Sequence, residues 1–207
     1  MALDFEQQFY SDEIQYIVGC DEAGRGCWLG PVFAGAVILP KDFSCELIND
    51  SKKLSEKQRE NAFNIIKENA IAWGVGTASV EEIDKMNILN ASRLAMVRAI
   101  ENMKHDYDLI LTDCMKIPGA KKDVIDLVHG DARALCIAAA SIIAKVSRDH
   151  LCYELDKQYP EYNIKKNKGY GTKDHIEALK QYGPVKGLHR FSYAPIKSLS
   201  IEKITLF

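Results

Sequence analysis

The sequence predicts an α/β fold built on a mixed sheet of five strands. Three short apolar runs, at 16–20, 31–40 and 71–78, come early in the chain with short links, which is typical of an antiparallel sheet edge. Two later runs, at 107–112 and 124–128, follow a long helix, and a strand after a helix is the crossover pattern of parallel pairing.

Capping signals and apolar periodicity predict the helices. Ser55 with Gln58, and Ser79 with Glu82, have the spacing of a capping box, in which two side chains satisfy backbone N–H groups at a helix start. Apolar residues then recur at steps of three and four, so each helix has one face to bury. An alanine-rich stretch makes up the last long helix. The predicted helices span 56–69, 88–103 and 134–157.

Composition indicates one compact domain with little overall attraction for nucleic acid. The chain has 207 residues, 47% of them apolar, and a formal net charge of −2. Positive charge is instead local, since residues 163–203 include nine Lys or Arg against three Asp or Glu. Any nucleic-acid partner would therefore have to bind through such a local basic region. The alternative is a solvated, weakly structured tail.

Cysteine usage and the absence of long apolar runs predict a cytoplasmic protein. The six cysteines include no CxxC pair and no Cys/His cluster at zinc spacing. Several lie in apolar runs, where a free thiol packs as a small apolar group, so a reducing compartment is expected. No leader-like segment stands at residues 1–10, and no apolar run approaches about 20 residues. We expect a cytoplasmic monomer with no membrane partner.

Four acids stand at comparable places in this fold. Asp21 and Glu22 close the first strand, Asp113 follows the fourth, and Asp131 precedes the last long helix. In an open α/β sheet, ligands bind at the carboxyl ends of strands, where the order of the strands switches. Acids at such places can therefore lie close together in the fold although they are far apart in the sequence. Clustered carboxylates repel one another unless a cation neutralises them, and Mg²⁺ prefers hard oxygen ligands. Two such ions about 3.5 to 4 Å apart can catalyse phosphodiester hydrolysis. Alternatively, Asp113 and Asp131 each cap the next element.

Several blocks of sequence, in a fixed order from about residue 15 to 197, resemble the ribonuclease HII family, the type 2 ribonucleases H. Any one block alone is a weak signal, whereas their joint order and spacing are highly specific. The blocks are Asp21-Glu22-Ala23-Gly24-Arg25-Gly26, Gly30-Pro31-Val32, Asp50-Ser51-Lys52-Lys53-Leu54, Thr112-Asp113, Gly130-Asp131, Ile137 to Asp149, Lys168 to Thr172, Tyr182-Gly183-Pro184 and His189-Arg190.

The resemblance implies a ribonuclease H-like fold, with a mixed five-stranded sheet flanked by helices and a C-terminal helical extension. A catalytic domain would span 1–160, and a basic extension and tail, 161–207, would belong to the same folding unit. It also implies that Asp21, Glu22, Asp113 and Asp131 bind Mg²⁺ or Mn²⁺, two ions with substrate bound. The implied reaction is hydrolysis of the RNA strand of RNA/DNA hybrids. Incision on the 5′ side of single ribonucleotides in duplex DNA, leaving 3′-hydroxyl and 5′-phosphate ends, is implied as well.

The resemblance also implies roles in substrate binding for the turn Gly24-Arg25-Gly26 and for Tyr170. The resemblance implies that Gly24-Arg25-Gly26 reads the ribose 2′-hydroxyl through its backbone, and glycines do allow such close approach. It implies that Tyr170 stacks at the RNA-to-DNA junction, although the ring could instead fill space in the extension. Other polar residues are plausible phosphate contacts or, alternatively, simply solvated charges. These are Lys52, Lys53, Ser141, Lys145 and Arg148.

Two dipeptides depart from the family pattern, and two other functions stay open. Cys27-Trp28 and Cys114-Met115 flank the predicted site without replacing a ligand, so they bear on loop geometry and substrate fit. One alternative function is a non-catalytic module that binds RNA/DNA hybrids, which would not need four acids. The other is a DNA-directed nuclease or resolvase, which the Gly24–Gly26 turn and Tyr170 disfavour.

The tail resembles the short peptide by which bacterial repair proteins bind the sliding clamp. That peptide has a Gln, an aliphatic residue, a small polar residue and a terminal Leu-Phe. Lys203 stands here in place of the Gln, so the match is incomplete. The alternative is that the terminal apolar side chains pack on the protein itself. The tail residues are Lys203, Ile204, Thr205, Leu206 and Phe207.

Overall fold

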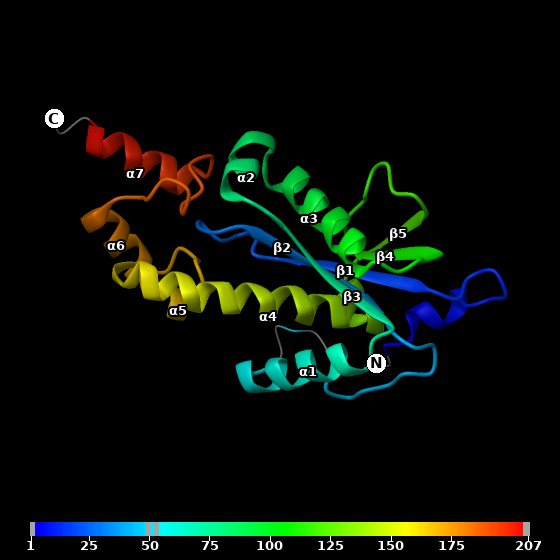
Figure 1. Cartoon of the computed structure of the whole chain (residues 1–207). Coiled ribbons are helices and arrows are strands. Elements are labelled where there is room, and N and C mark those ends of the chain that lie inside the picture. The colour runs from blue at the N-terminus through cyan, green and yellow to red at the C-terminus, as the bar shows by residue number, and fades with distance from the viewer. Residues whose placement is uncertain (1–2, 49–50, 52–53, 205–207) are drawn as a thin grey trace.

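The structure, a computed structural model, describes residues 3–48, 51 and 54–204, and for 200–204 it describes the backbone alone. Five strands form one sheet in the order β3-β2-β1-β4-β5 (Figure 1). The first three pair antiparallel, whereas β1, β4 and β5 run parallel, so the predicted mixed sheet is confirmed. The strands are β1 Ile17–Ala23, β2 Val32–Ile38, β3 Ala72–Ala78, β4 Leu109–Asp113 and β5 Asp123–Leu127.

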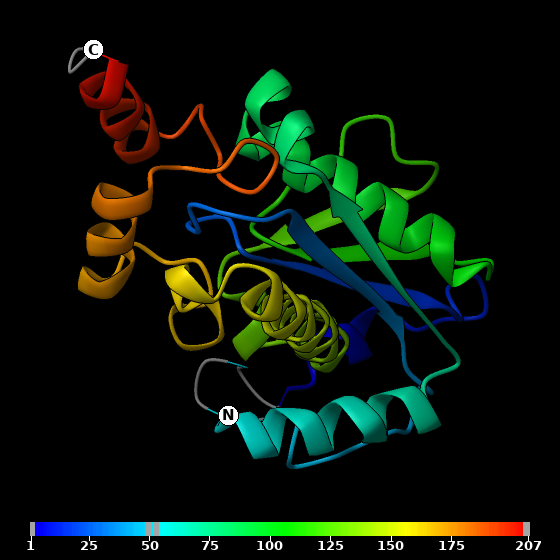
Figure 2. The ribbon, with the colours of Figure 1, turned by 60° about the vertical axis from the view of Figure 1, so that its left-hand side comes forward.

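Helices cover both faces of this sheet. Helix α3 packs on β2 and β3, while α4 packs on β1 and β2 from the other side (Figures 1 and 2). Helix α1 lies beside α4 on that side, and its Phe63 ring packs against Trp73 of β3. Both predicted capping boxes are present, at Ser55 and Ser79. The helices are α1 Glu56–Asn69, α2 Val80–Met86, α3 Ile88–Met103, α4 Leu135–Gln158, α5 Ile164–Asn167, α6 Lys173–Tyr182 and α7 Ala194–Ile204, with short 3₁₀ turns η1 Phe5–Phe9, η2 Gly130–Ala132 and η3 Pro160–Tyr162.

The first strand is longer than the sequence predicts. Strand β1 continues through Ala23, because its pairing with β2 extends to Phe33. Asp21 and Glu22 are therefore strand residues and do not follow the strand. This placement matters for the site, since a side chain on a paired strand has far less freedom than one on a loop.

Glycines bring the long helix α4 into direct contact with the centre of the sheet. A Cβ atom on Gly19 of β1 would lie 2.1 Å from the carbonyl carbon of Cys136, and one on Gly35 of β2 would lie 2.3 Å from the oxygen of Ala140. Only residues without a side chain fit there, so the helix axis is fixed against β1 and β2. Residues further along α4, beginning with Ser141, are thereby placed beside the end of β1.

The region after Pro160 is helical, as the resemblance implies, and it shares an apolar cluster with the rest of the molecule. Leu29 and Cys152 come from the main body, and Leu188 and Ile196 come from the extension. The loop from β1 to β2 reaches toward the segment that joins α6 to α7 (Figure 2). Among the described residues, no helix combines the length and apolarity that a membrane span requires.

Candidate active site

Three carboxylates converge where β1 and β4 end. The two strands are parallel neighbours with Cys20 opposite Thr112, so the next residues, Asp21 and Asp113, lie side by side. Asp131 comes from the turn η2 just before α4. Oxygen atoms of these three residues all lie within 4.8 Å of one another. From their places at strand ends and before the last long helix, the sequence predicted that these three acids would converge together with Glu22.

Backbone N–H groups hold two of the carboxylates in place. The N–H of Glu22 donates to Oδ1 of Asp21 at 2.7 Å. The N–H of Gly130 donates to Oδ1 of Asp113, also at 2.7 Å. The second bond ties the end of β4 to the turn that carries Asp131. Hydrogen bonds to charged acceptors are among the stronger ones in proteins, so the geometry is well fixed.

The electrostatics of the cluster favour a cation. Burial and the negative charges of Glu22 and Asp113 raise the pKa of Asp21 well above its usual value, although hydrogen bonds from Ser141 and the Glu22 N–H act in the opposite direction. A divalent cation would offset this repulsion and let all three carboxylates stay ionised. The donors are hard oxygens, which suits Mg²⁺ or Mn²⁺ and not zinc.

Glu22 follows Asp21 on β1, but it is not part of the three-carboxylate group. Its Oε1 atom forms an ion pair with Nη1 of Arg25 at 3.1 Å. Arg25 thus connects the acidic end of the strands to the glycine-containing turn that follows β1. The predicted quartet of acids therefore divides, in this structure, into three clustered carboxylates and one glutamate paired with an arginine.

A cavity of about 260 Å³ contains most of the predicted substrate residues. Three residues that line it were not predicted as site residues, namely Ala23, Ser51 and Arg59, whereas the predicted Asp131 does not line it. Ser51 lies within a matched block, whereas a lone arginine in the first turns of a helix gave no signal. Lys52 and Lys53 lie outside the described residues. The predicted residues that line the cavity are Asp21, Glu22, Gly24, Arg25, Gly26, Asp113, Ser141, Lys145, Arg148 and Tyr170.

The polar residues of α4 differ in how they face the cavity. Ser141 shares a hydrogen bond of 2.8 Å with Ser51, and Lys145 forms an ion pair with Asp149 at 2.7 Å. Arg148 is only 2% exposed. Its guanidinium donates to the carbonyl oxygens of Lys168, at 2.9 Å, and Leu29, at 3.4 Å. Arg148 therefore joins two loops, a placement that suits a structural contact better than a phosphate contact.

The turn after β1 is shaped by its glycines and lies next to the predicted stacking tyrosine. Gly24 has φ +96°, and a Cβ there would lie 2.2 Å from Nε of Arg148. Gly26 is exposed, and a Cβ there would meet Cε1 of Tyr170 at 3.7 Å. Tyr170 is 48% exposed, so its ring is open to a ligand on one side. The turn and the ring together form one wall of the cavity.

A chain of hydrogen bonds through two buried histidines reaches the backbone of Tyr170. The N–H of Val185 donates to Nδ1 of His189, so a neutral His189 carries its proton on Nε2. That proton faces Nε2 of His175 at 3.3 Å, and Nδ1 of His175 is then free to donate to the Tyr170 carbonyl at 2.9 Å. The chain is complete only when both rings are neutral.

The two departures from the family pattern have structural consequences. The ring of Trp28 occupies the space beside Gly171, where a Cβ would lie 2.1 Å from Cζ2. Cys114 has φ +50°, in the left-handed region that favours glycine. Its thiol is exposed, while the following Met115 is buried. Neither departure displaces one of the clustered carboxylates.

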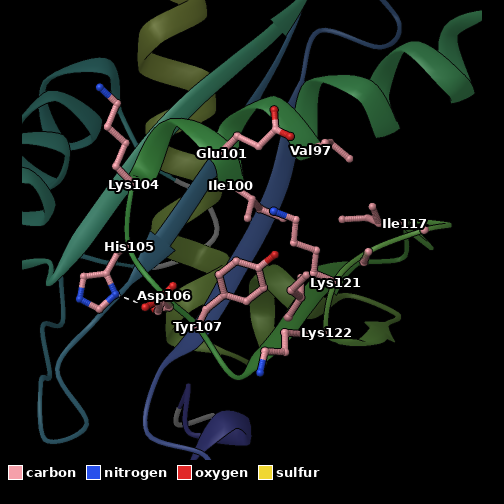
Figure 3. A pocket seen from close by; sticks show the side chains of 13 residues that line it. Val97, Ile100, Glu101, Lys104, His105, Asp106, Tyr107, Ile117, Lys121 and Lys122 are labelled. Carbon is pink, nitrogen blue, oxygen red and sulfur yellow. Dashed lines mark hydrogen bonds between the residues drawn. The ribbon is translucent and has the colours of Figure 1, made fainter.

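A second, roomier cavity of about 500 Å³ lies elsewhere, between α3 and the residues before β5 (Figure 3). Tyr107, Lys121 and Lys122 line it. Its acids, Glu101 and Asp106, do not belong to the three-carboxylate group. Cavity size therefore does not mark the active site, and the clustered carboxylates do.

The fold and the clustered carboxylates define a ribonuclease H-like, metal-dependent nuclease. The solved ribonuclease H2 of Pyrococcus horikoshii OT3 is 25% identical, with a TM-score of 0.76 over 90% of this chain and 98% of that one. The family model described as Ribonuclease HII matches residues 18–196. The chain belongs to the ribonuclease HII family, whose members are endonucleases that act on RNA/DNA hybrids.

One further relative agrees with this assignment, and one further solved structure agrees with the fold. Ribonuclease HII of Caldanaerobacter subterraneus subsp. tengcongensis is 49% identical over 189 residues, which is 91% of this chain and 78% of the relative. A solved complex of PCNA with RNase HII from Archaeoglobus fulgidus contains a chain that is 23% identical, with a TM-score of 0.70 over 84% of this chain and 92% of that one. At that identity the likeness concerns the fold alone.

Proposed function

We propose that this enzyme incises duplex DNA on the 5′ side of a single embedded ribonucleotide, in addition to cleaving the RNA strand of hybrids. The products would carry 3′-hydroxyl and 5′-phosphate ends. The observation that carries the chemistry is the convergence of Asp21, Asp113 and Asp131 within 4.8 Å at one edge of the sheet. The selection of a ribonucleotide is attributed to the turn and tyrosine beside it.

Two divalent ions, Mg²⁺ or Mn²⁺, would be held by Asp21, Asp113 and Asp131, with Glu22 as the fourth ligand. When bound, such ions activate an attacking water and stabilise the leaving oxygen. Burial of Asp21 and its position on a paired strand keep its oxygens in place without help from the substrate. Arg25 holds Glu22 by an ion pair at 3.1 Å, so this ligand is oriented by the turn.

Ribose recognition is assigned to the backbone of Gly24, Arg25 and Gly26, together with the ring of Tyr170. A 2′-hydroxyl both donates and accepts, so backbone N–H and C=O groups at close range can distinguish it from a 2′-hydrogen. The exposed face of Tyr170 can stack on the neighbouring sugar or base. Phosphate contacts are assigned to Ser141, Lys145, Lys52 and Lys53, and we add Ser51 and Arg59 because both line the cavity.

Cleavage of one duplex that carries a single ribonucleotide tests this proposal. The expected result is one cut on the 5′ side of that nucleotide, seen only with Mg²⁺ or Mn²⁺, and no cut in the matched all-DNA duplex. Tight hybrid binding with no cleavage at any metal concentration would favour the non-catalytic module. Equal cleavage of both duplexes would favour a DNA-directed nuclease.

A sliding clamp is proposed as a protein partner. Lys203 and Ile204 end α7, and Thr205, Leu206 and Phe207 lie outside the described residues. Burial of a Leu and a Phe in a preformed pocket contributes roughly 1.5 to 3 kcal/mol for each side chain, enough for a weak, reversible contact. A chain that ends at Glu202 should keep its thermal stability and its cleavage of free oligonucleotides while losing clamp binding. Calorimetry with no clamp binding by the full chain at high micromolar concentration would end this proposal.

A further inference from the structure

The carbonyl oxygen of Arg25, in the middle of the turn after β1, accepts two hydrogen bonds from a distant segment. Nη1 of Arg190 donates at 3.1 Å, and the hydroxyl of Tyr193 donates at 2.5 Å. The same Arg190 nitrogen also donates to the Tyr193 hydroxyl at 2.9 Å, so the three groups form a closed set. Both side chains come from the segment between α6 and α7 of the extension.

Arg190 also connects the two ends of the loop that joins β1 to β2. Its Nε donates to the carbonyl oxygen of Gly30 at 2.9 Å, while Nη1 reaches Arg25. Backbone bonds reinforce this attachment, because the Arg190 N–H donates to Trp28 and the Gly30 N–H donates to Leu188. One side chain thus sets the distance between the start and the end of the loop.

The burial of Arg190 is costly and is not offset by an anion. The residue is 0% exposed, and burial lowers the pKa of its guanidinium. Among the residues that the structure describes, no carboxylate lies within ion-pair distance, and Nη2 has no hydrogen-bond partner. Backbone carbonyl oxygens take the place of a counter-charge. Burial of a cation in this way costs desolvation free energy that an apolar residue at the same place would not cost. This cost points to a role for Arg190 beyond packing.

Because the Arg25–Gly26 peptide is planar, the hydrogen bonds to its C=O also set the direction of its N–H. No peptide bond in the described chain is cis, so the C=O of Arg25 and the N–H of Gly26 point in opposite directions. Because Arg190 and Tyr193 hold the C=O, the Gly26 N–H is directed away from them. Gly26 is exposed beside Tyr170, and among the described residues its N–H has no acceptor. A donor is therefore presented on the cavity side of the turn.

We propose that Arg190 and Tyr193 are positioning residues that fix the Arg25–Gly26 peptide and thereby set the enzyme's selection of the ribose 2′-hydroxyl. This inference rests on the proposed function of the turn. Neither residue lines the cavity of the candidate active site. The C-terminal extension would thus contribute to substrate choice through the turn it holds, and not only through its positive charge.

Tyr193→Phe is the decisive variant, because it removes one hydroxyl and keeps the ring that lies 5.2 Å from the Arg190 guanidinium. Two quantities are measured for the full chain with Mg²⁺: kcat/KM on a duplex with one ribonucleotide, and the inhibition constant of the all-DNA duplex as competitor. Loss of the hydrogen bond to the Arg25 carbonyl oxygen predicts a fall in kcat/KM of about 3- to 10-fold. The inhibition constant should not change, because the all-DNA duplex offers no 2′-hydroxyl. A small fall in Tm is expected, because the Tyr193 hydroxyl takes part in two hydrogen bonds.

Two matched tyrosines of the extension serve as controls. Tyr162→Phe removes a buried hydroxyl that donates to Gly183 at 2.6 Å, so it should lower Tm without changing the preference for a ribonucleotide. Tyr182→Phe removes an exposed hydroxyl and should change neither. Arg190→Lys, where it folds, should lower kcat/KM more than Tyr193→Phe does.

The outcomes separate this inference from the proposed function. A parent enzyme that does not cut at the ribonucleotide overturns the proposed function itself. A parent that cuts, with Tyr193→Phe equal to it in kcat/KM, overturns the positioning role alone. An equal loss of kcat/KM and of affinity for the all-DNA duplex also overturns it, because the effect would then be general and not specific to the ribose.

Discussion

Asp21 and Asp113 of the carboxylate cluster line the same cavity as the turn that we propose reads the ribose, but the two parts are held in place by different means. Asp21 and Asp113 belong to paired neighbouring strands, and short backbone hydrogen bonds fix their oxygens. The turn at Gly24–Gly26 is held from behind by Arg190 and Tyr193, which follow it by more than 160 residues. The carboxylates are thus positioned by the sheet, whereas the turn that we propose selects the substrate is positioned by side chains of the extension.

This difference predicts that the two parts fail independently when they are mutated. Changes at the strand ends should abolish hydrolysis and leave binding preference intact. Changes in the turn or in its supports should weaken selection and leave metal binding intact. Glu22 and Arg25 join the two parts through their ion pair, so a mutation of either residue could affect both metal binding and selection.

The largest effect is expected from Asp21→Asn. Removal of a ligand charge from the cluster should lower the single-turnover rate by at least about 1,000-fold, because the site loses much of its hold on the ions. The fold and hybrid binding should persist, since no apolar contact is lost. Asp131→Asn should behave in the same way. Asp126→Asn, an exposed acid on neighbouring β5, is the control. Near-parental turnover of Asp21→Asn across Mg²⁺ and Mn²⁺ concentrations would refute the assignment of the cluster.

Tyr170→Ala should have the next largest effect. Loss of stacking worth about 1 to 3 kcal/mol predicts incision at a lone ribonucleotide that is about 5- to 150-fold slower. Tyr182→Ala, at a similarly exposed ring outside the cavity, is the control. The rates are compared on the single-ribonucleotide duplex and on a long hybrid. If Tyr170→Ala cuts the single ribonucleotide as fast as the parent does, the ring is structural.

The histidine pair of the extension makes its own contribution to the pH dependence of stability. Burial and the neighbouring His175 lower the pKa of His189 to about 4. An unfolded histidine has a pKa of about 6.5, so between those values the unfolded chain binds more protons. Stability should therefore fall as pH falls from about 6.5 toward 4, by about 3 kcal/mol in total for this group.

Urea unfolding at pH 7.5 and pH 5.0 measures this dependence. His189→Asn keeps an acceptor for the Val185 N–H but cannot titrate, so part of the pH dependence should disappear. His129→Asn, at an exposed histidine, should leave it unchanged. Identical pH dependence in the parent and His189→Asn would show that the buried pair does not control stability.

The smallest effect is expected from Cys114→Gly, next to the cluster. Cys114 has φ +50°, a conformation that costs a side-chain-bearing residue about 1 to 2 kcal/mol relative to glycine. The greater chain entropy of glycine offsets part of this gain. We expect a net stabilisation of about 0.5 to 1 kcal/mol, measured by urea unfolding, with cleavage unchanged. A destabilised variant would mean that the exposed thiol makes a contact worth more than the backbone strain.

The sequence predicted most of the sheet and the acids because their signals are local. Apolar runs marked the strands, and acids at the ends of runs marked Asp21, Glu22 and Asp113. The extension of β1 to Ala23 escaped prediction, since it depends on pairing with Phe33 of the partner strand. Pairing partners are a property of the folded chain, and no periodicity of the single strand encodes them.

The supports of the turn could not be predicted, for the same physical reason. His189 and Arg190 belong to a matched block, but nothing local says that the arginine is completely buried or that it reaches Arg25. Arg148 shows the same limit, because its helical spacing suggested a phosphate contact but gave no sign that its guanidinium also joins Lys168 to Leu29. The sequence alone does not show whether an Arg or Lys side chain will contact a phosphate or a carbonyl oxygen.

The central claim, that metal binding and ribose selection are built separately, is tested most directly by the Mg²⁺ dependence of single-turnover cleavage at one ribonucleotide. The parent is compared with Glu22→Gln and Tyr193→Phe. We expect Glu22→Gln to shift the midpoint to higher Mg²⁺ concentration. Tyr193→Phe should lower the rate at saturating Mg²⁺ and leave the midpoint where it is in the parent. A midpoint that moves in Tyr193→Phe as it does in Glu22→Gln would contradict the account, because the turn and the carboxylates would then act as one unit.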